Sequence, residues 1–136
     1  MVSAENVSVI VVESQPLMLA ALSTALSAEG MTILAEVSDS KQLVEIARKK
    51  NPCLILFSVS VPSLNDLERI SDLRREVPDA LILALTSSEF RAQEQMALDH
   101  GAHKVLTKLA SRSEILNAIK AMFQKKVYPA SVQVNQ

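Results

Sequence analysis

The chain alternates short apolar runs, several of them rich in β-branched residues, with longer stretches in which apolar residues recur at helical spacing. The apolar runs cover residues 7–12, 32–37, 54–57, 80–85 and 105–106. Continuous apolar runs of this length are typical of strands that are buried on both faces. Strands that alternate with helices favour a parallel sheet joined by right-handed crossovers and covered by helices on both sides. We therefore predict an α/β fold with five strands and five helices.

Local signals mark where the predicted helices begin and end. Gly30 ends the first helix and Gly101 ends the fourth, because glycine is favoured just after a helix. Asp39 with Gln42, and Ser111 with Glu114, have the spacing of a capping box, which predicts the start of the second and fifth helices.

Composition limits the class of protein. At 136 residues, with 49% hydrophobic and 21% charged residues, the chain fits one globular domain, which we place at residues 1–126. Residues 127–136 have no apolar period and are interpreted as a tail or the start of an interdomain linker. A single cysteine excludes a disulfide framework and a cysteine-based zinc site. No apolar run reaches 18 residues, so we expect no membrane span, no signal peptide and a cytoplasmic location.

Polar residues follow four of the predicted strands. In a doubly wound sheet, ligands bind beyond the carboxyl ends of the strands, so these residues are the candidate site. No glycine-rich loop follows any strand, which argues against a nucleotide or flavin. With 14 Lys and Arg residues against 15 Asp and Glu residues, we also expect no direct contact with nucleic acid. The candidate site residues are Glu13, Ser14, Ser58, Ser60, Thr86 and Lys108.

Over residues 7–124 the sequence resembles the receiver domain of bacterial two-component response regulators. The resemblance rests on four segments in order: 11–16, 52–62, 83–86 and 101–108. The stretch from Lys108 to Ser111 is most similar to receivers that carry a LuxR-type helix-turn-helix effector. The resemblance implies a flavodoxin-like sheet with strand order 2-1-3-4-5, and it assigns Ser58 to the position of the phospho-acceptor aspartate.

The departures from the family pattern bear directly on function. Of the family's acidic pair, only Glu13 is acidic, since Ser14 occupies the second position. Phosphoryl transfer to a receiver needs a carboxylate nucleophile and a Mg²⁺ held by hard oxygen ligands. A serine hydroxyl is a poor nucleophile without a base, and no histidine lies near that strand end in the sequence. We therefore predict a degenerate pocket with no enzymatic activity, no cofactor, and weak or absent Mg²⁺ binding.

Lys108 has two interpretations. It is either a remaining switch cation or, as we favour, the partner of Glu13 in a structural ion pair that imitates the charge balance of a phosphorylated site. Thr86 similarly serves either as the family's switch hydroxyl or as a hydrogen-bonding residue of the next loop.

The last helix carries an apolar face wider than one stripe, which predicts contact with the tail or with a second copy of the chain. The predicted homodimer face combines the fourth helix, fifth strand and fifth helix, and its residues are Arg91, Glu94, Lys104, Ile115, Ile119, Lys120 and Phe123. The leading hypothesis is a phosphorylation-independent signalling and dimerisation module of a DNA-binding transcription factor, whose C-terminal effector lies outside this chain. The alternatives are a ligand-sensing domain that uses the neutralised pocket, and a receiver phosphorylated at Ser58 or Asp66.

Overall fold

The computed structural model describes residues 6–59, 64–87 and 91–135, with side chains described as far as residue 124. In chain order the elements are β1 (Ser8–Val12), α1 (Pro16–Ala28), β2 (Thr32–Val37), the 3₁₀ turn η2 (Ser40–Gln42), α2 (Leu43–Lys50), β3 (Leu54–Ser58), α3 (Leu64–Glu76), β4 (Leu81–Thr86), α4 (Arg91–His100), β5 (Lys104–Thr107) and α5 (Arg112–Asn135).

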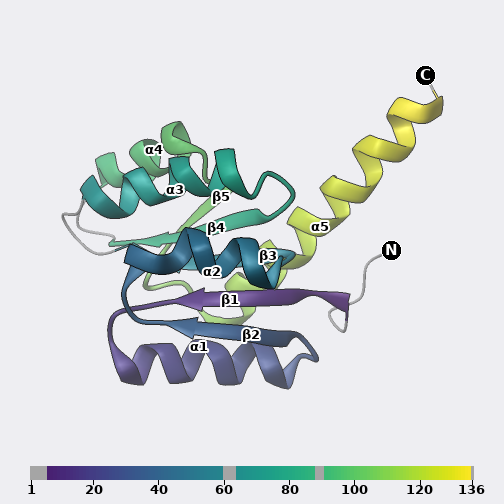
Figure 1. The fold of residues 1–136 in the computed structure, drawn as a ribbon. Helices are drawn as coiled ribbons and strands as arrows, with labels where there is room; N and C mark the ends of the chain where they lie inside the picture. The colour runs from purple at the N-terminus through teal and green to yellow at the C-terminus, as the bar shows by residue number, and fades with distance from the viewer. Residues whose placement is uncertain (1–5, 60–63, 88–90, 136) are drawn as a thin grey trace.

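The strands form one parallel sheet in the order β2-β1-β3-β4-β5. Helices α1 and α5 cover one face of the sheet, and α2, α3 and α4 cover the other (Figure 1). This is the flavodoxin-like arrangement, so the predicted fold class and strand order are confirmed. Its consequence for the site is that the ends of β1, β3, β4 and β5 all meet at one edge of the sheet.

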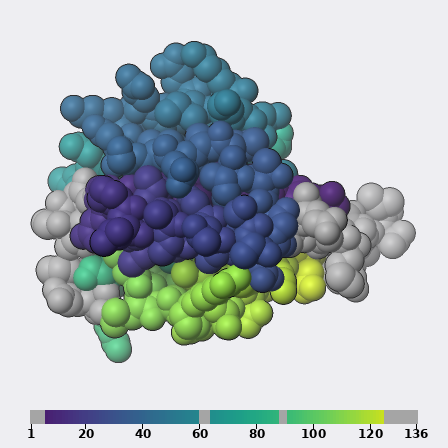
Figure 2. Space-filling model, turned by 90° about the horizontal axis from the view of Figure 1, so that it is seen from below, coloured from purple at the N-terminus to yellow at the C-terminus, as the bar shows by residue number. Residues whose placement is uncertain are grey.

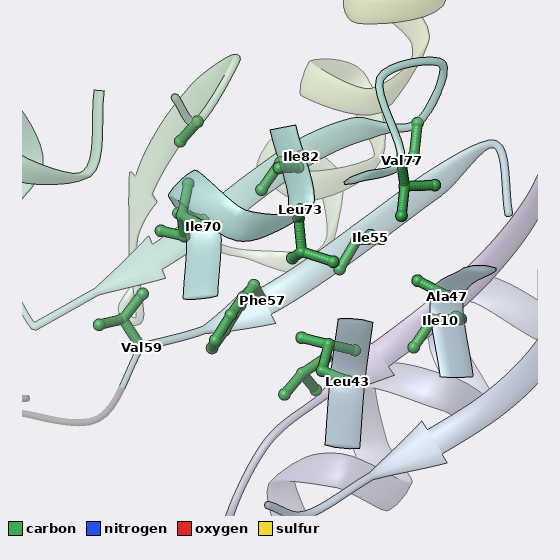
Figure 3. Packing of buried hydrophobic residues seen from close by; sticks show 14 of the residues in the cluster. Ile10, Leu43, Ala47, Ile55, Phe57, Val59, Ile70, Leu73, Val77 and Ile82 are labelled. Atoms are coloured by element: carbon green, nitrogen blue, oxygen red, sulfur yellow. The ribbon is translucent and has the colours of Figure 1, made fainter. Parts of the chain in front are cut away.

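The sheet separates two apolar cores because successive side chains of a strand point to opposite faces. Ile55 and Phe57 of β3 lie on the face that α2 and α3 cover, and Figure 3 shows them beside Leu43, Ile70 and Leu73 from these helices. Leu54 and Leu56 of β3 point to the opposite face and belong to the core that α1 and α5 cover. Two buried faces on one strand explain why β3 reads as an uninterrupted apolar run.

The predicted helix signals are confirmed at one capping box and only in part at the other. Ser111 and Glu114 form the reciprocal pair, with the Glu114 N–H donating to Ser111 Oγ at 3.1 Å and the Ser111 N–H donating to Glu114 Oε1 at 3.0 Å. Asp39 instead accepts from the Lys41 N–H at 3.0 Å, and Gln42 makes no capping bond. The prediction there is wrong in detail because a 3₁₀ turn, rather than the first turn of α2, follows Asp39.

Helix α5 differs most from its prediction. It continues through Asn135, so residues 127–135 are helical rather than an unpatterned tail. After Gly101 the sequence contains no further glycine to end the helix. The domain boundary at residue 126 stays a prediction.

Candidate functional site at the carboxyl edge of the sheet

Backbone hydrogen bonds fix the residues that follow the strands. The Glu13 N–H donates to the Val37 carbonyl oxygen at 2.9 Å, and the Lys108 N–H donates to the Thr86 carbonyl oxygen at 2.8 Å. Ser58, the last residue of β3, is paired in register with Leu85 of β4. The parallel register therefore brings Glu13, Ser58, Thr86 and Lys108 to one edge, as predicted, whereas Ser60 lies outside the described residues.

The pleat of the strands divides these residues between the two sides of the sheet. Glu13 follows β1 with the parity of the side chains beneath α1 and α5, and Ser14 has the opposite parity. Accordingly, Glu13, Ser58 and Lys108 line one cavity, while Ser14 lines another. Ser58 lines both, so it is the residue at which the two sides meet.

The first cavity lies between α1 and α5 and is named the α1–α5 cavity. It has a volume of about 170 Å³, and aliphatic side chains of both helices form most of its wall. Figure 2, a view from below, shows the atoms of α1 bordering those of α5. The lining residues are Glu13, Met18, Ala21, Leu22, Ala25, Leu26, Ser58, Leu85, Lys108, Ala110, Arg112, Ile115 and Leu116.

The second cavity lies on the other side of β1 and β3 and is named the η2–α3 cavity. It has a volume of about 200 Å³ and is lined by Val12, Ser14, Ser38, Asp39, Ser40, Phe57, Ser58 and Asp66. Two of its polar side chains, Ser40 and Asp66, bond to each other. Asp66 is 8% exposed, and its Oδ1 accepts a hydrogen bond from Ser40 Oγ at 2.8 Å.

Sequence reasoning singled out Asp66 but missed the contribution of Ser40. A serine in a short turn carries no signal of its contact with a residue 26 positions away.

The predicted ion pair between Glu13 and Lys108 is wrong: no ion pair joins them among the described residues, although both line the α1–α5 cavity. Glu13 is 3% exposed, and its Oε2 accepts the Gln15 N–H at 2.8 Å and Ser14 Oγ at 3.4 Å. The backbone thus holds this carboxylate at the start of α1. Both bonds go to Oε2, and within the described part of the chain Oε1 accepts none.

Two hydroxyls at the sheet edge are buried and unpartnered among the residues that the structure describes. Ser58 is 4% exposed and Thr86 is fully buried, yet neither Ser58 Oγ nor Thr86 Oγ1 has a hydrogen-bond partner there. Leaving a buried hydroxyl unsatisfied costs about 1–3 kcal/mol, so these positions are functional candidates rather than stabilising ones.

Neither histidine is available to activate Ser58. His100 Nδ1 lies 2.8 Å from the Met96 carbonyl oxygen, and His103 Nδ1 accepts the Ile82 N–H at 3.0 Å, so both belong to other contacts. Among the described residues, no group of three or more His, Cys, Asp or Glu side chains is arranged to hold a metal ion. Around Ser58, the two cavities offer hydroxyls and the carboxylates of Glu13, Asp39 and Asp66, and no histidine of the described chain lines either of them.

The predicted dimer face is wrong in its apolar part. Ile115, Ile119 and Phe123 are 8%, 1% and 7% exposed and pack in the core beneath α1 and α5. The wide apolar face of α5 is thus used by its own domain, since α5 contacts the sheet and also walls the α1–α5 cavity. The polar members of that face, Arg91, Glu94, Lys104 and Lys120, remain at least partly exposed.

Comparison with known proteins places this chain in one family. Residues 9–120 match the model of the response regulator receiver domain, so the chain belongs to that family.

Within the described helices, none is both long and apolar enough to cross a membrane.

Three relatives illustrate the likeness. A Pseudomonas aeruginosa protein carrying the name of a transcriptional regulator is 29% identical over 114 residues, which cover 84% of this chain and 55% of that protein. The nitrate/nitrite response regulator NarL of Escherichia coli K12 is 26% identical over 116 residues, which cover 85% of this chain and 54% of NarL. A LuxR-family two-component response regulator from an Aurantimonas species superposes with a TM-score of 0.79 at 21% identity, covering 88% of this chain and 86% of that one. This chain spans about half the length of the two curated relatives.

Proposed function

We propose that this chain is a phosphorylation-independent receiver domain that serves as a signalling and dimerisation module of a DNA-binding transcriptional regulator. The observation that supports the proposal is the chemistry at the end of β3, where a buried serine, 4% exposed, stands at the position that the resemblance assigns to the acceptor aspartate. A carboxylate attacks phosphorus as an anion, whereas a serine hydroxyl must first lose its proton to a base.

The electrostatics of the edge support the same conclusion. Glu13 is the one carboxylate that remains from the family's acidic set, and two of its lone pairs are already engaged by Gln15 and Ser14. Mg²⁺ requires near-octahedral coordination by hard oxygens and usually takes one or two carboxylates directly. We therefore expect weak or absent Mg²⁺ binding and no catalytic turnover.

The transcriptional role is inferred from the relatives. The two curated relatives are named as a transcriptional regulator and as NarL, and about half of each lies beyond the matched region. The receiver itself offers little for DNA, because several basic residues near its helix ends are engaged: Arg48 pairs with Glu76, Lys49 with Glu45 and Arg75 with Asp72. A C-terminal DNA-binding domain, rather than this one, is the part that would contact DNA.

Intact-mass spectrometry after incubation with acetyl phosphate and Mg²⁺ tests the central point. We expect no mass gain, with a receiver that retains its aspartate as the positive control under the same conditions. A gain of one phosphoryl group would overturn the proposal. The variants Ser58→Ala and Asp66→Asn would then identify the acceptor, because the gain disappears only in the variant that lacks it.

Sedimentation velocity tests the dimer. We expect self-association through the polar residues of α4, β5 and α5, weakened by the charge reversal Glu94→Lys and restored by adding Lys104→Glu if the two side chains pair across the two-fold axis. Lys50→Glu, on the exposed end of α2, is the matched control. An association constant that Glu94→Lys leaves unchanged would exclude this face.

A further inference from the structure

The α1–α5 cavity has the size and lining of a small-molecule site. Its volume of about 170 Å³ is slightly larger than that of an engineered cavity of about 150 Å³ that binds benzene. The apolar part is built by side chains from three elements: Met18, Leu22, Leu26, Leu85, Ile115 and Leu116. A branched aliphatic group or a single ring therefore fits this space, and a nucleotide does not.

One end of the cavity carries two opposite charges that do not neutralise each other. Glu13 and Lys108 both line it, yet no ion pair joins them among the described residues. The other cation of the lining, Arg112, pairs instead with Glu29 at 3.6 Å. Water is a poor substitute for a charged partner in a partly buried site, where opposite charges attract more strongly than in bulk solvent.

Two further polar atoms lack a partner at the same place. Glu13 Oε1 accepts no hydrogen bond, and the buried Ser58 Oγ has no partner, within the part of the chain that the structure describes. An incoming ammonium group has three donors for Oε1, and an incoming carboxylate has acceptors for the Ser58 hydroxyl and the Lys108 ammonium. All of these unmatched groups are complementary to one small zwitterion.

From this arrangement we propose that the α1–α5 cavity binds an apolar α-amino acid, with the ammonium at Glu13, the carboxylate at Lys108 and Ser58, and the side chain between α1 and α5. An apolar acid that lacks the amine would leave the Glu13 carboxylate without a partner. An apolar amine that lacks the carboxylate would leave the Lys108 ammonium without one. The inference rests on the proposed function, because a phosphoryl group on Ser58 would occupy the polar end of the same cavity. The ligand then takes the place of phosphorylation as the input.

Calorimetric titration of the full chain with leucine and its two single-charge analogues tests the proposal. We expect saturable binding of leucine. Isocaproate, which lacks the amine, and isoamylamine, which lacks the carboxylate, should each bind at least about tenfold more weakly, because each leaves one buried charge unpaired. Glycine has both charges but no side chain for the cavity and should show no saturation. Equal affinity for leucine and isocaproate would identify an anion site instead and overturn the assignment.

Variants locate the site. Lys108→Met keeps an unbranched side chain of nearly the same length but removes its charge, and Glu13→Gln keeps an acceptor for the Gln15 N–H, so each should weaken leucine binding about tenfold or more. Ala21→Leu adds bulk to the cavity wall and should abolish binding. Ala20→Leu, which lies on α1 outside the cavity, and Lys104→Met are matched controls that should bind as the unmodified chain does.

The outcomes of this test are separable from those of the phosphorylation test. Leucine binding that Ala21→Leu abolishes supports the site, whatever acetyl phosphate does. If leucine, isocaproate and isoamylamine all fail to bind, the ligand inference is overturned. The proposed function still stands in that case, provided that acetyl phosphate produces no mass gain. A phosphoryl mass gain on Ser58 would overturn the proposed function, even if leucine binds to the unmodified chain.

Discussion

On the η2–α3 side of Ser58, the buried Asp66 carboxylate accepts a hydrogen bond from the Ser40 hydroxyl, which lines the same cavity. On the α1–α5 side, Glu13 and Lys108 line one cavity without an ion pair between them, and the rest of the wall is aliphatic. The two cavities have similar volumes, about 200 and 170 Å³. They differ in one respect: Asp66 has a side-chain partner within its own cavity, whereas among the described residues no bond joins Glu13 to Lys108.

In our proposal, this difference separates a structural polar cluster from a binding site. A buried polar group that is matched within the fold contributes to stability and has little left to offer a ligand. A buried polar group that is left unmatched costs stability and is retained where a function compensates for it. The same edge of one sheet therefore carries both kinds of arrangement, and substitutions on each side should have different consequences.

The largest expected effect compares the two apolar cores. Leu73 of α3 is completely buried in the core on that face of the sheet and lines neither cavity, so Leu73→Ala should lower the free energy of unfolding by about 3–4 kcal/mol. Leu22 already faces empty space in the α1–α5 cavity, so Leu22→Ala should cost only about 2 kcal/mol. Urea denaturation measures both. Leu17→Ala, at a residue 88% exposed, is the control and should change little. Equal losses at positions 73 and 22 would mean that the cavity wall is as tightly packed as the other core.

The next effect compares the two carboxylates. Asp66→Ala should lower the free energy of unfolding by about 2 kcal/mol, because it leaves the Ser40 hydroxyl without its partner. Glu13→Gln, which keeps the backbone contact with Gln15, should cost well under half of that. The double variant Asp66→Ala with Ser40→Ala should lose less than the sum of the two single changes. A strictly additive result would show that the bond contributes nothing to folding.

A smaller effect concerns α5, which lines the α1–α5 cavity and not the η2–α3 cavity. Ser111→Ala removes the hydroxyl that caps α5 and should cost about 1 kcal/mol in thermal or urea unfolding. Ser113→Ala, in the same turn and exposed but outside the capping box, is the matched control. If both changes cost the same, helix propensity rather than the cap explains the loss.

The smallest effect has the opposite sign. Ser58→Ala removes a buried hydroxyl that has no partner among the described residues, and it should raise the free energy of unfolding by about 0.5–1 kcal/mol. Ser14→Ala, at an exposed residue, should be neutral. Destabilisation by Ser58→Ala would mean that the hydroxyl is satisfied, by water for example, and would weaken the comparison between the two sides.

Local signals in the sequence were sufficient for most of the strands and helices, while the strand order came from the family resemblance. The run at residues 32–37 matches β2, and the Ser111 and Glu114 capping box opens α5 as predicted. Gly30 and Gly101 have positive φ angles of 92° and 123°, a conformation that glycine adopts without strain. Periodicity and helix caps operate over a few residues, so a single sequence contains them in full.

The site was predictable in its members but not in its geometry. Parallel topology alone brings Glu13, Ser58 and Lys108 to one edge, and the sequence predicted that much. Whether two opposite charges meet depends on side-chain directions over a few ångströms, and the spacing of residues in the sequence does not determine these directions. The predicted ion pair between Glu13 and Lys108 was therefore wrong. The prediction that the apolar face of α5 contacts a second copy was wrong for a related reason. The sequence pattern is the same whether Ile119 packs on its own sheet or on a partner, and the structure places it on its own sheet.

A serine hydroxyl has a single hydrogen to donate. Ser58 borders two cavities, so an acceptor that takes this hydrogen on one side withdraws it from the other. An aspartate in its place would have no hydrogen to give at neutral pH, and its two oxygens could accept donors from both sides at once. The exchange therefore turns a position that only accepts hydrogen bonds into one that can also donate, but to one side at a time.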